Sequence, residues 1–380
     1  MTDVLIVGGG PSGLLLGKLL ADDGVRVTIL ERQSREHVLS RIRAGVLEWG
    51  TVEMLRRAGV SARMDRDGQE HTGCRMGLSN RSFRVDFEKS VGKRVMVWGQ
   101  TEVTRDLYEA HEAMGTDIRH GVEDVVLDLD GPAATFRRNG AEEHVEADFV
   151  VGCDGFHGVS RRSIPDGVRQ EFERVYPFGW LGILSETPPV DHELIYANHP
   201  RGFALSSMRN PQLSRHYIQV PSGTKPEAWS DDAFWDELRR RLPHEAAEGM
   251  VTGPAIEKSV APLRSFVSEP MRHGRLLLIG DAAHIVPPTG AKGLNLAVSD
   301  VFYAHQAIML GGEAFERYSQ RALARVWKAV RFSWWMTTLL HRFPEQSEFD
   351  QRVQEAELAY VEGSRAAQAA LAENYVGLPY

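Results

Sequence analysis

The segment VLIVGGGPSGLLLGKLLADDGVRVTILER, residues 4–32, determines the fold that the sequence predicts for the N-terminal part of the chain. The apolar run Val4–Val7 is followed by Gly8, Gly10 and Gly13 in the spacing G-x-G-x-x-G, and then by an apolar helical pattern. The first glycine permits a tight turn, the second lets backbone approach a pyrophosphate, and the third allows close helix–strand packing. We therefore predict a strand, a glycine turn and a helix.

A second strand follows this helix and ends in an acid. Glu31 stands about 20 residues after the glycine turn, where a carboxylate can bind ribose hydroxyls. The helix N-terminus, where Ser12 lies, offers free N–H groups and a partial positive charge to phosphates. A lone glycine motif also occurs in ordinary strand–helix turns. Here the strand, helix, second strand and acid are all in register, which favours a dinucleotide site.

A second segment, RLLLIGDAAHIVPPTGAKGLNLAVSD at residues 275–300, has an unusual order of residue types. The apolar run Leu276–Ile279 ends at Gly280 and is followed at once by Asp281. Two prolines, two glycines and a lysine come before helical periodicity resumes. A core strand that ends in a carboxylate and a stiff, backbone-exposing loop indicates that a polar group is held against the loop.

Three motifs together resemble those of the class A flavoprotein monooxygenases, which are single-component aromatic hydroxylases. They are the N-terminal glycine motif, VVGCDGFHGVSR with Asp154 and Gly155, and the Gly280–Asp281 pair. The resemblance implies bound FAD, with Asp281 on the ribityl-side hydroxyls and the loop 287–295 against the isoalloxazine. A helix N-terminus would stabilise the negative charge that a reduced flavin carries.

Further segments along the whole chain resemble the branch of that family that acts on 4-hydroxybenzoate. They include SRIRAGVLEWGTVEMLRRAGV, GQTEVTRDL, ELIYANHPRGFAL, KSVAPLRSFV and ENYVGLP. The resemblance implies hydroxylation of 4-hydroxybenzoate to 3,4-dihydroxybenzoate with NAD(P)H and O₂, through a flavin C4a-hydroperoxide. It also implies an α/β fold, with a Rossmann-like FAD domain, an interleaved β-rich substrate domain and a helical C-terminus.

The segment GFALSSMRNPQLSRHYIQV, residues 202–220, predicts a β-hairpin around a polar loop. Period-two alternation places Ser207 and Arg209 on one face, and Arg215 and Tyr217 likewise share a face. An arginine with neighbouring hydroxyls suits a carboxylate, because its planar fork donates two hydrogen bonds. A solvated hairpin is the alternative. By resemblance, Ser207, Arg209 and Tyr217 bind the substrate carboxylate and Arg215 lies by the flavin.

The resemblance also implies a relay for the phenolic proton. Tyr196 and Tyr375 match a hydrogen-bonded tyrosine pair, and His71, in RDGQEHTG, matches the histidine at the solvent end of the relay. A histidine that titrates near ~6.5 is a natural point of exchange with water. The Pro288 carbonyl matches a contact to the substrate hydroxyl.

The sequence has no second G-x-G-x-x-G motif that would bind the nicotinamide coenzyme. This absence fits the resemblance, which implies that the coenzyme binds in a surface cleft. The segment ERQSREHVLSRIRAG, residues 31–45, is rich in cations and matches the part that reads the 2′-phosphate, although His37 replaces a tyrosine. NADPH is therefore expected and NADH remains possible; a solvated helix face is the alternative. The further expected cofactor contacts are Arg32, Gln33, Arg41, Arg43, Gln100, His157, Arg264, Leu294 and Asn295.

Composition sets the remaining expectations. The chain has 380 residues, 42% of them hydrophobic, and a formal charge of −8, which argues against nucleic acid as a partner. No apolar run approaches the roughly 18 residues of a membrane span, and no signal peptide is visible. With only Cys74 and Cys153, neither a disulfide framework nor a zinc site is expected. These features favour the cytoplasm.

The predicted domains are interleaved. Residues 1–70, 98–170 and 273–300 form the FAD domain, residues 71–97 and 171–272 the substrate domain, and residues 301–380 a helical region. The aromatic-rich stretch 331–343 could be core packing or a dimer face, and family precedent favours a homodimer. Two alternatives stay open: the same fold acting on 4-aminobenzoate or 3,4-dihydroxybenzoate, and a flavin redox sensor that hydroxylates nothing.

Overall fold

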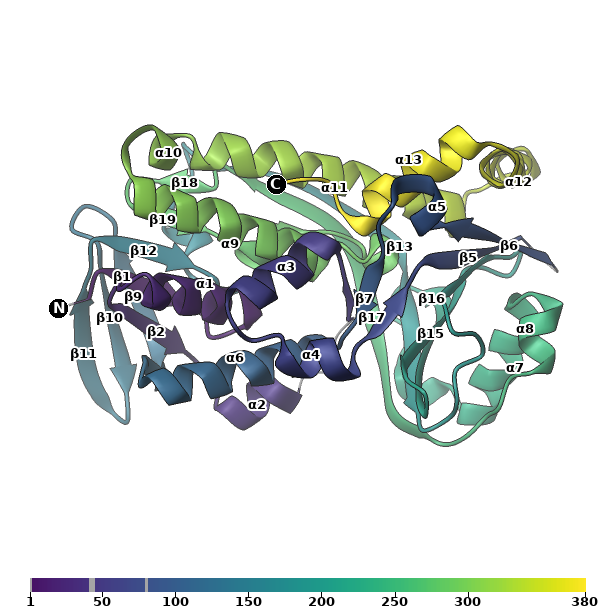
Figure 1. Cartoon of the computed structure of the whole chain (residues 1–380), viewed down its shortest axis with the longest axis horizontal. Coiled ribbons are helices and arrows are strands. Elements are labelled where there is room, and N and C mark those ends of the chain that lie inside the picture. The colour runs from purple at the N-terminus through teal and green to yellow at the C-terminus, as the bar shows by residue number, and fades with distance from the viewer. Residues whose placement is uncertain (1, 41–44, 79–80) are drawn as a thin grey trace.

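The structure, a computed structural model, describes residues 2–40, 45–78 and 81–380. One half of the molecule is built around a six-stranded sheet of order β18-β19-β12-β1-β2-β8 (Figure 1). Its neighbours are parallel except for β18 and β19. The strands are β1 (Val4–Val7), β2 (Val27–Glu31), β8 (Asp117–His120), β12 (Phe149–Gly152), β18 (Arg272–His273) and β19 (Leu276–Leu278).

The predicted N-terminal unit is confirmed. All four residues of β1 are buried, as expected for a parallel strand that is covered on both faces. Helix α1 (Pro11–Asp22) begins directly after the glycine turn with Pro11 in its first turn, where the missing N–H costs no hydrogen bond. It packs against α6 (Gln100–Met114) and α9 (Gly293–Leu310). The glycine turn therefore lies at the carboxyl end of a central strand.

The other half is built on an eight-stranded sheet of order β20-β17-β13-β16-β15-β14-β5-β6. The predicted hairpin is confirmed, since β15 and β16 pair antiparallel within it. The strands are β5 (Gly73–Leu78), β6 (Arg81–Asp86), β13 (Gln170–Ser185), β14 (Ile195–Asn198), β15 (Ala204–Asn210), β16 (Leu213–Pro221), β17 (Ala255–Glu269) and β20 (His284–Ile285).

The two faces of this sheet have different cores, because side chains alternate along each strand. On one face, Ile183 and Ile218 pack with Phe234 of α7 (Asp231–Arg241), a helix capped by the Ser230 hydroxyl. On the other face, Trp180 and other aromatic side chains pack against the C-terminal helices. The predicted site residues lie on this second face.

Two three-stranded sheets complete the fold. The order β11-β10-β9 is formed by β9 (Glu123–Asp128), β10 (Ala133–Arg138) and β11 (Ala141–Glu146). The order β3-β7-β4 is formed by β3 (Val46–Leu47), β4 (Gln69–His71) and β7 (Val95–Val97). The second sheet lies where the predicted domain boundaries fall, and the boundary after residue 70 passes through β4. Both predicted domains thus contribute to it.

Helices cover the sheets and join the two halves. The shorter ones are α2 (Arg35–Ser40), α3 (Trp49–Arg57), α4 (Ala62–Asp67), α5 (Phe87–Val91), α8 (His244–Glu248) and α10 (Gly312–Glu316). At the C-terminus lie α11 (Tyr318–Leu340), α12 (Glu348–Gly363) and α13 (Arg365–Val376). Figure 1 shows α11 running along one side of both halves, and α13 lies against α5 and β6.

The aromatic-rich stretch is mostly core. Phe332 and Met336 of α11 are buried against the aromatic face of the large sheet, whereas Trp334 is 42% exposed. Of the helices that the structure describes, none is long and apolar enough to cross a membrane.

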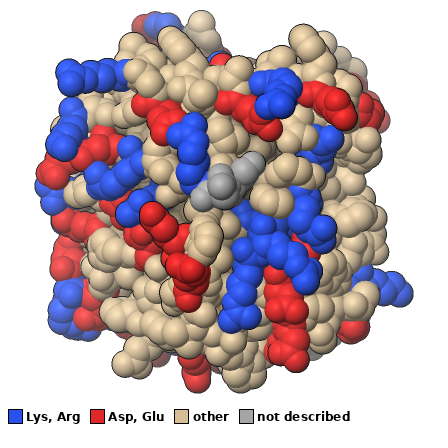
Figure 2. Space-filling view, turned by 90° about the vertical axis from the view of Figure 1, so that its right-hand side faces the viewer, with Lys and Arg blue, Asp and Glu red and all other residues tan. Residues whose placement is uncertain are grey.

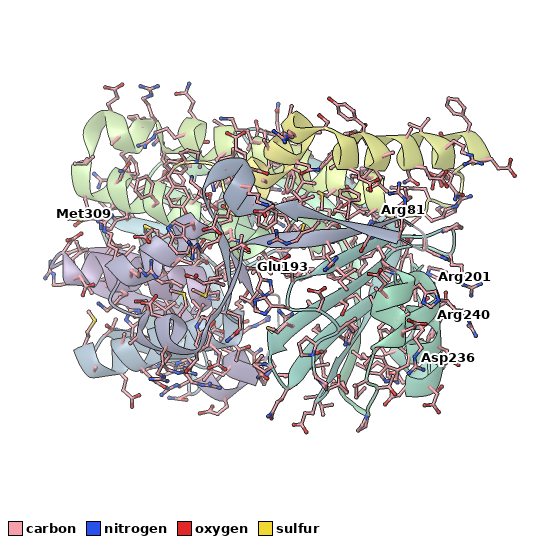
Figure 3. The ribbon with its side chains drawn as sticks, turned by 45° about the vertical axis from the view of Figure 1, so that its right-hand side comes forward. Arg81, Glu193, Arg201, Asp236, Arg240 and Met309 are labelled. Atoms are coloured by element: carbon pink, nitrogen blue, oxygen red, sulfur yellow. The ribbon has the colours of Figure 1, made fainter. Side chains whose placement is uncertain are left out.

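Charges are mixed at the end of the molecule that carries α7, α8 and α12. Figure 2 shows acidic and basic side chains intermingled on this face. Figure 3 places Arg201, Asp236 and Arg240 together at its edge, and Glu237 bridges Arg201 and Arg240 at 2.7 and 3.5 Å. An anionic ligand would therefore have to be attracted by local arginines.

Candidate functional site

The glycine turn after β1 is closed by backbone packing. Gly8 has a φ of 115°, and a Cβ there would lie 2.3 Å from the Cys153 carbonyl oxygen. A Cβ on Gly13 would lie 2.0 Å from the Gly8 carbonyl oxygen, whereas a Cβ on Gly10 would meet no protein atom within 4 Å. The space beside Gly10, at the start of α1, is the space that a pyrophosphate needs. The Tyr108 hydroxyl steadies the turn by donating to the Gly9 carbonyl at 3.1 Å.

Glu31 stands beside this turn at the end of β2. Its carboxylate accepts hydrogen bonds from the N–H groups of Gly9 at 2.7 Å and Gln33 at 2.8 Å. These two bonds fix the carboxylate, and its remaining lone pairs can accept ribose hydroxyls. Ser12, predicted as a cofactor contact, is buried, and its hydroxyl lies 3.7 Å from where a Cβ on Gly280 would stand. The first and third motifs thus meet at Ser12.

Asp154 of the middle motif lies against the same turn. Its Oδ2 accepts hydrogen bonds from the Ser160 N–H and hydroxyl, both at 2.9 Å, and its Oδ1 is buried without a partner among the described residues. Burial raises the pKa of the Asp154 carboxyl, against the lowering effect of these bonds. The side chain therefore braces the loop that carries Gly155, and its free oxygen is the atom left for a ligand.

Asp281 is exposed at the carboxyl end of β19, and none of the described residues bonds to it. The neighbouring backbone is fixed from behind by Asp300, whose Oδ2 accepts from the Gly280 N–H at 2.9 Å and lies 2.6 Å from His284 Nε2. Burial opposes charging of His284, but the Asp300 carboxylate outweighs it and raises the pKa of the imidazole. A free carboxylate next to open glycine backbone fits the hydroxyls of FAD.

The loop before α9 is more constrained than expected. The side chain of Asn295 forms all four of its hydrogen bonds within the protein. Its Oδ1 accepts from the Glu48 N–H and the Thr51 hydroxyl, and its Nδ2 donates to the Val46 and Ala291 carbonyls. Asn295, like Leu294, can therefore contact a cofactor only through the free N–H groups of the first helical turn. The Pro288 carbonyl accepts from the Ala291 N–H at 2.9 Å, so a substrate hydroxyl would have to use its second lone pair.

Strand register places the predicted substrate residues on one face of the large sheet. Tyr196 on β14 lies opposite Leu205 on β15, which lies opposite Tyr217 on β16. One row along, Ser207 lies opposite Arg215. Directly opposed residues share a face. The sheet thus brings together Tyr196, Ser207, Arg209, Arg215 and Tyr217. Alternation in the sequence predicted only that Ser207 shares a face with Arg209 and that Arg215 shares a face with Tyr217.

Arg209 is the member of this set whose charge is least satisfied. The side chain is half-buried, its Nε is buried without a partner among the described residues, and desolvation lowers the pKa of its guanidinium despite the neighbouring Tyr217. A cation that is partly withdrawn from water and keeps an unpartnered N–H favours an anionic ligand.

Arg215, by contrast, already has a carboxylate partner. Its guanidinium pairs with Glu257 and donates to the Ser259 hydroxyl at 3.1 Å. Ser207 is also engaged, because its hydroxyl donates to the Arg215 carbonyl at 2.9 Å. The Tyr217 ring fits because residue 182 is glycine: a Cβ there would lie 2.6 Å from the ring. Arg209 is therefore the group available for a substrate carboxylate.

The two tyrosines form a buried pair. The Tyr196 and Tyr375 hydroxyl oxygens lie 2.6 Å apart, although 179 residues separate them in the chain. Burial raises the pKa of both phenols above the ordinary value, so both stay neutral near pH 7. Neutral, hydrogen-bonded hydroxyls can pass a proton and can donate to a phenolate.

The His71 side chain is fully buried, whereas the sequence predicted it at the solvent end of the relay. Both ring nitrogens lack a partner among the described residues. Burial, with a smaller contribution from His192, lowers its pKa from 6.5 to about 4. β4 pairs antiparallel with β7, with His71 opposite Val95, and the sequence pattern of one polar loop could not reveal this pairing.

The coenzyme segment is only partly described. Arg41 and Arg43 lie outside the described residues. Arg32 and His37 are exposed, and Arg35 pairs with Glu112 at 3.0 Å.

The other expected coenzyme contacts lie on separate elements. Gln100 is the first residue of α6. His157 and Arg264 come from different motifs but both contact the Phe156 ring, at 5.0 Å between ring centroids and 4.7 Å from the guanidinium. The structure therefore brings His157 and Arg264 to one place.

Two buried groups near the site were missed by the sequence analysis. Trp180 Nε1 donates to His341 Nε2 at 2.7 Å, beside Phe203 and Tyr217. Lys292 Nζ donates to Glu48 at 2.5 Å and to the Tyr375 carbonyl at 3.1 Å. The sequence signal for Lys292 was its position within the small-residue run TGAKGLN. The Trp180–His341 pair had no such signal in the sequence.

Comparison with known proteins agrees with this arrangement. The family model described as "FAD binding domain" matches residues 1–333. Over 387 aligned residues, 100% of this chain and 96% of the relative, the chain is 54% identical to p-hydroxybenzoate hydroxylase of Acinetobacter baylyi. It is 29% identical to aklavinone 12-hydroxylase of Streptomyces peucetius, over 83% of this chain and 69% of that one. The chain belongs to the FAD-binding-domain family of flavin-dependent monooxygenases.

Solved structures support the fold alone. The p-nitrophenol 4-monooxygenase of Pseudomonas putida DLL-E4 superposes with a TM-score of 0.85 at 18% identity, covering 100% of this chain and 99% of that one. A probable FAD-dependent monooxygenase of Pseudomonas aeruginosa gives 0.74 at 21% identity, with 97% and 99% covered.

Proposed function

We propose that this protein is an FAD-dependent 3-hydroxylase of 4-hydroxybenzoate. The observation that carries the proposal is the sheet face that holds Arg209, half-buried with an Nε that has no partner among the described residues, together with the Tyr196–Tyr375 pair. A benzoate with a para hydroxyl has an anion at one end and an acidic phenol at the other, and this face offers a partner for each. The full-length likeness to a p-hydroxybenzoate hydroxylase supports it further.

The carboxylate end of the substrate would bind Arg209. Two parallel N–H donors of the guanidinium match the two carboxylate oxygens, and the Tyr217 hydroxyl adjoins them. Binding would give the half-buried Arg209 cation an anionic partner. Ser207 would keep its bond to the Arg215 carbonyl and orient the strand beneath.

The phenol end would lie against Tyr196. Hydroxylation at the carbon next to the hydroxyl is easier on a phenolate than on a phenol, because the ring is then richer in electrons. Tyr196 and Tyr375 would take the phenolic proton by exchange along their 2.6 Å hydrogen bond, and the Pro288 carbonyl would orient the hydroxyl. Bound FAD supplies the reduction of O₂ that yields the transferred oxygen atom. The buried aromatic wall around Trp180 excludes water.

The proposal is tested by supplying the purified, FAD-loaded protein with 4-hydroxybenzoate, O₂ and either NADPH or NADH. 3,4-Dihydroxybenzoate and hydrogen peroxide are quantified together. Stoichiometric product with little peroxide supports the proposal. Rapid coenzyme oxidation that yields mainly peroxide would move the assignment to 4-aminobenzoate or 3,4-dihydroxybenzoate. No stimulation of coenzyme oxidation by any of these rings would favour the redox sensor.

NADPH is the proposed coenzyme. Support comes from the exposed cation Arg32 just after β2, where a 2′-phosphate would be read, and from His157 and Arg264 around Phe156. The ratio of kcat/KM for the two coenzymes decides between NADPH and NADH.

We also propose that the domains divide as the sequence predicts, and that two copies of the chain pair through α12. Phe349, Val353, Ala356 and Tyr360 are all exposed along one face of α12, at spacings of four, three and four residues. This is the spacing of a helix–helix seam. In an antiparallel pair centred between residues 354 and 355, Phe349 of one copy meets Tyr360 of the other, and Arg352 lies opposite Glu357. The face is therefore self-complementary, as a two-fold interface requires.

A further inference from the structure

His341 follows directly after α11, and its side chain is fully buried among aromatic rings. Its ring is nearly parallel to that of Phe178, with 4.8 Å between centroids and 6° between planes. The Phe203 ring lies 4.4 Å from it, inclined by 24°. The imidazole is therefore held in one plane by its neighbours, because turning it would drive it into these rings.

Both ring nitrogens of His341 have partners, and the partners decide the tautomer. Nδ1 lies 3.0 Å from the Thr337 carbonyl oxygen, which can only accept, so Nδ1 carries the hydrogen. Nε2 lies 2.7 Å from Trp180 Nε1, which can only donate, so Nε2 is the acceptor. Burial lowers the pKa of the imidazole from 6.5 to about 3. The ring is thus neutral near pH 7 and offers its lone pair to Trp180 alone.

The backbone around His341 is bonded to the large sheet. Asn198 Nδ2 donates to the Leu339 carbonyl at 3.2 Å. Gln219 donates to the Arg342 carbonyl at 2.5 Å and accepts from the Arg342 N–H at 3.0 Å. These bonds satisfy backbone groups that have no partner within the helix at its C-terminal end. They also fix the place of His341 relative to the strands that carry the site.

Trp180 connects this fixed point to the carboxylate end of the site. Its ring lies 5.1 Å from the Tyr217 ring, measured between centroids. Trp180 and Gly182, two residues apart on β13, share a face, and Tyr217 lies opposite Gly182. The Tyr217 ring is already close to the Gly182 backbone, since a Cβ there would lie 2.6 Å from it. The position of the Tyr217 hydroxyl beside Arg209 therefore depends on where Trp180 is held.

We propose that His341 is a positioning residue for the substrate carboxylate, because it accepts the indole N–H of Trp180 and so holds Tyr217 in place. The inference rests on the proposed function. Without this acceptor, the Trp180 N–H would be a buried donor with no partner, and the indole would turn away from Tyr217 to find one. The loss would fall on substrate binding and not on the hydroxylation step, since His341 is remote from the tyrosine pair's shared hydrogen bond.

The test measures steady-state kinetics of the FAD-loaded variants with 4-hydroxybenzoate. His341→Leu should raise KM about tenfold and leave kcat within about twofold, the pattern of a lost binding contact. His341→Gln should recover most of the loss, because its amide can accept from Trp180 and donate to Thr337. His216→Leu, at a fully buried histidine on the opposite face of the same sheet, is the matched control and should leave KM unchanged.

A second variant shows whether His341 acts through Trp180. Trp180→Phe removes the indole donor but keeps an aromatic ring, and it should raise KM by itself. In that background, His341→Leu should raise KM by less than about twofold further, because the contact is already gone. Should His341→Leu not load FAD, the KM of Trp180→Phe decides, and an unchanged value overturns the inference.

The outcomes separate this inference from the proposed function. If the wild type forms 3,4-dihydroxybenzoate but His341→Leu keeps its KM, the role of His341 is wrong and the function stands. Multiplicative effects of the two substitutions, or a loss that His341→Gln does not recover, show a purely structural role and also overturn it. A wild type that forms no 3,4-dihydroxybenzoate would overturn both.

Discussion

Arg209 is the residue whose energetics depend most on the substrate. Its side chain is half-buried and its Nε has no partner among the described residues, whereas its neighbour Arg215 is paired with Glu257. Two arginines six residues apart on one hairpin thus have different states, set by which strand lies beside them. Arg209 is therefore free to bind the substrate carboxylate, whereas Arg215 is held in its ion pair with Glu257.

Arg209→Ala should raise the KM for 4-hydroxybenzoate about 30-fold or more, because a charged hydrogen-bonded contact contributes roughly 2 kcal/mol or more. Arg209→Lys should recover part of it, since an ammonium lacks the fork that meets both carboxylate oxygens. Steady-state kinetics measure both. Arg137→Ala, at an exposed arginine of β10, is the control. An unchanged KM would remove Arg209 from the carboxylate site.

Tyr196→Phe should leave substrate affinity nearly unchanged while uncoupling turnover, because the phenolic proton loses its acceptor. The measured signs are a higher pKa of the bound substrate phenol and peroxide in place of 3,4-dihydroxybenzoate. Tyr176→Phe, which removes another buried hydroxyl that lies 3.2 Å from Ser265, should stay coupled. Full coupling in Tyr196→Phe would contradict the relay.

His71 should make the protein less stable in acid. Its pKa is about 4 in the folded chain, against an ordinary value of 6.5 that the unfolded chain restores. A group with a depressed folded pKa contributes stability above about pH 6.5, and this is lost as pH falls towards 4. Relative to His71→Gln, the wild type should lose about 2–3 kcal/mol of unfolding free energy between pH 7 and pH 4.5. Urea unfolding at the two pH values measures it; an equal loss in the variant would contradict the shift, and His144→Gln, an exposed position, is the control.

At the scale of elements, the strand–turn–helix unit separates two uses of glycine. Gly13 is needed by the protein, because a Cβ there would overlap the Gly8 carbonyl. Gly10 has open space around its Cβ position, so the protein alone does not require it. The cofactor does require it, if the pyrophosphate approaches the backbone there.

Gly10→Ala should therefore leave the apoprotein as stable as the wild type and weaken FAD binding at least about tenfold, because the added methyl occupies the phosphate space. Gly13→Ala should lower the melting temperature of the apoprotein itself. Thermal unfolding of the FAD-free proteins and fluorescence titration with FAD distinguish the two. Gly167→Ala, at another open glycine, is the control. Equal FAD affinity in Gly10→Ala would place the pyrophosphate elsewhere.

At the scale of the whole molecule, the C-terminal tail completes the site. Glu48 bridges Lys292 and Arg325 at 2.5 and 2.9 Å, and all three are buried. Lys292 donates to the Tyr375 carbonyl, and Arg325 donates to the Pro379 carbonyl at 3.1 Å. The Tyr375 end of the tyrosine pair is thus fixed by a C-terminal tail that leaves α13 and bonds to Lys292 and Arg325.

The exposed face of α12 should hold two copies together. Val353→Asp places a charge in the middle of the seam and should shift the protein towards monomer at concentrations where the wild type is a dimer, because the carboxylate would be buried against its symmetry mate. Sedimentation velocity measures the shift. Val126→Asp, at a valine of β9 that is 67% exposed, should not change the assembly. A dimer that persists in Val353→Asp would move the interface to another surface.

Residue patterns alone predict the elements whose signals are local. The apolar run, the glycine spacing and the terminal Glu31 predicted β1, the turn and α1, and alternation predicted the β15–β16 hairpin. Each depends on residues within one turn or one strand pair. Residue types also indicated which side chains suit a carboxylate or a phosphate.

Features that depend on distant partners are set only when the chain folds. The burial of His71 comes from β7 and the loop at His192, the charge on Arg215 is balanced by Glu257, and Asn295 is used up by Glu48, Thr51 and Val46. No local sequence pattern around these residues predicts the contacts. Whether a polar side chain is free for a ligand depends on desolvation and on its hydrogen-bond partners, and both are set by chain segments that meet only in the tertiary structure.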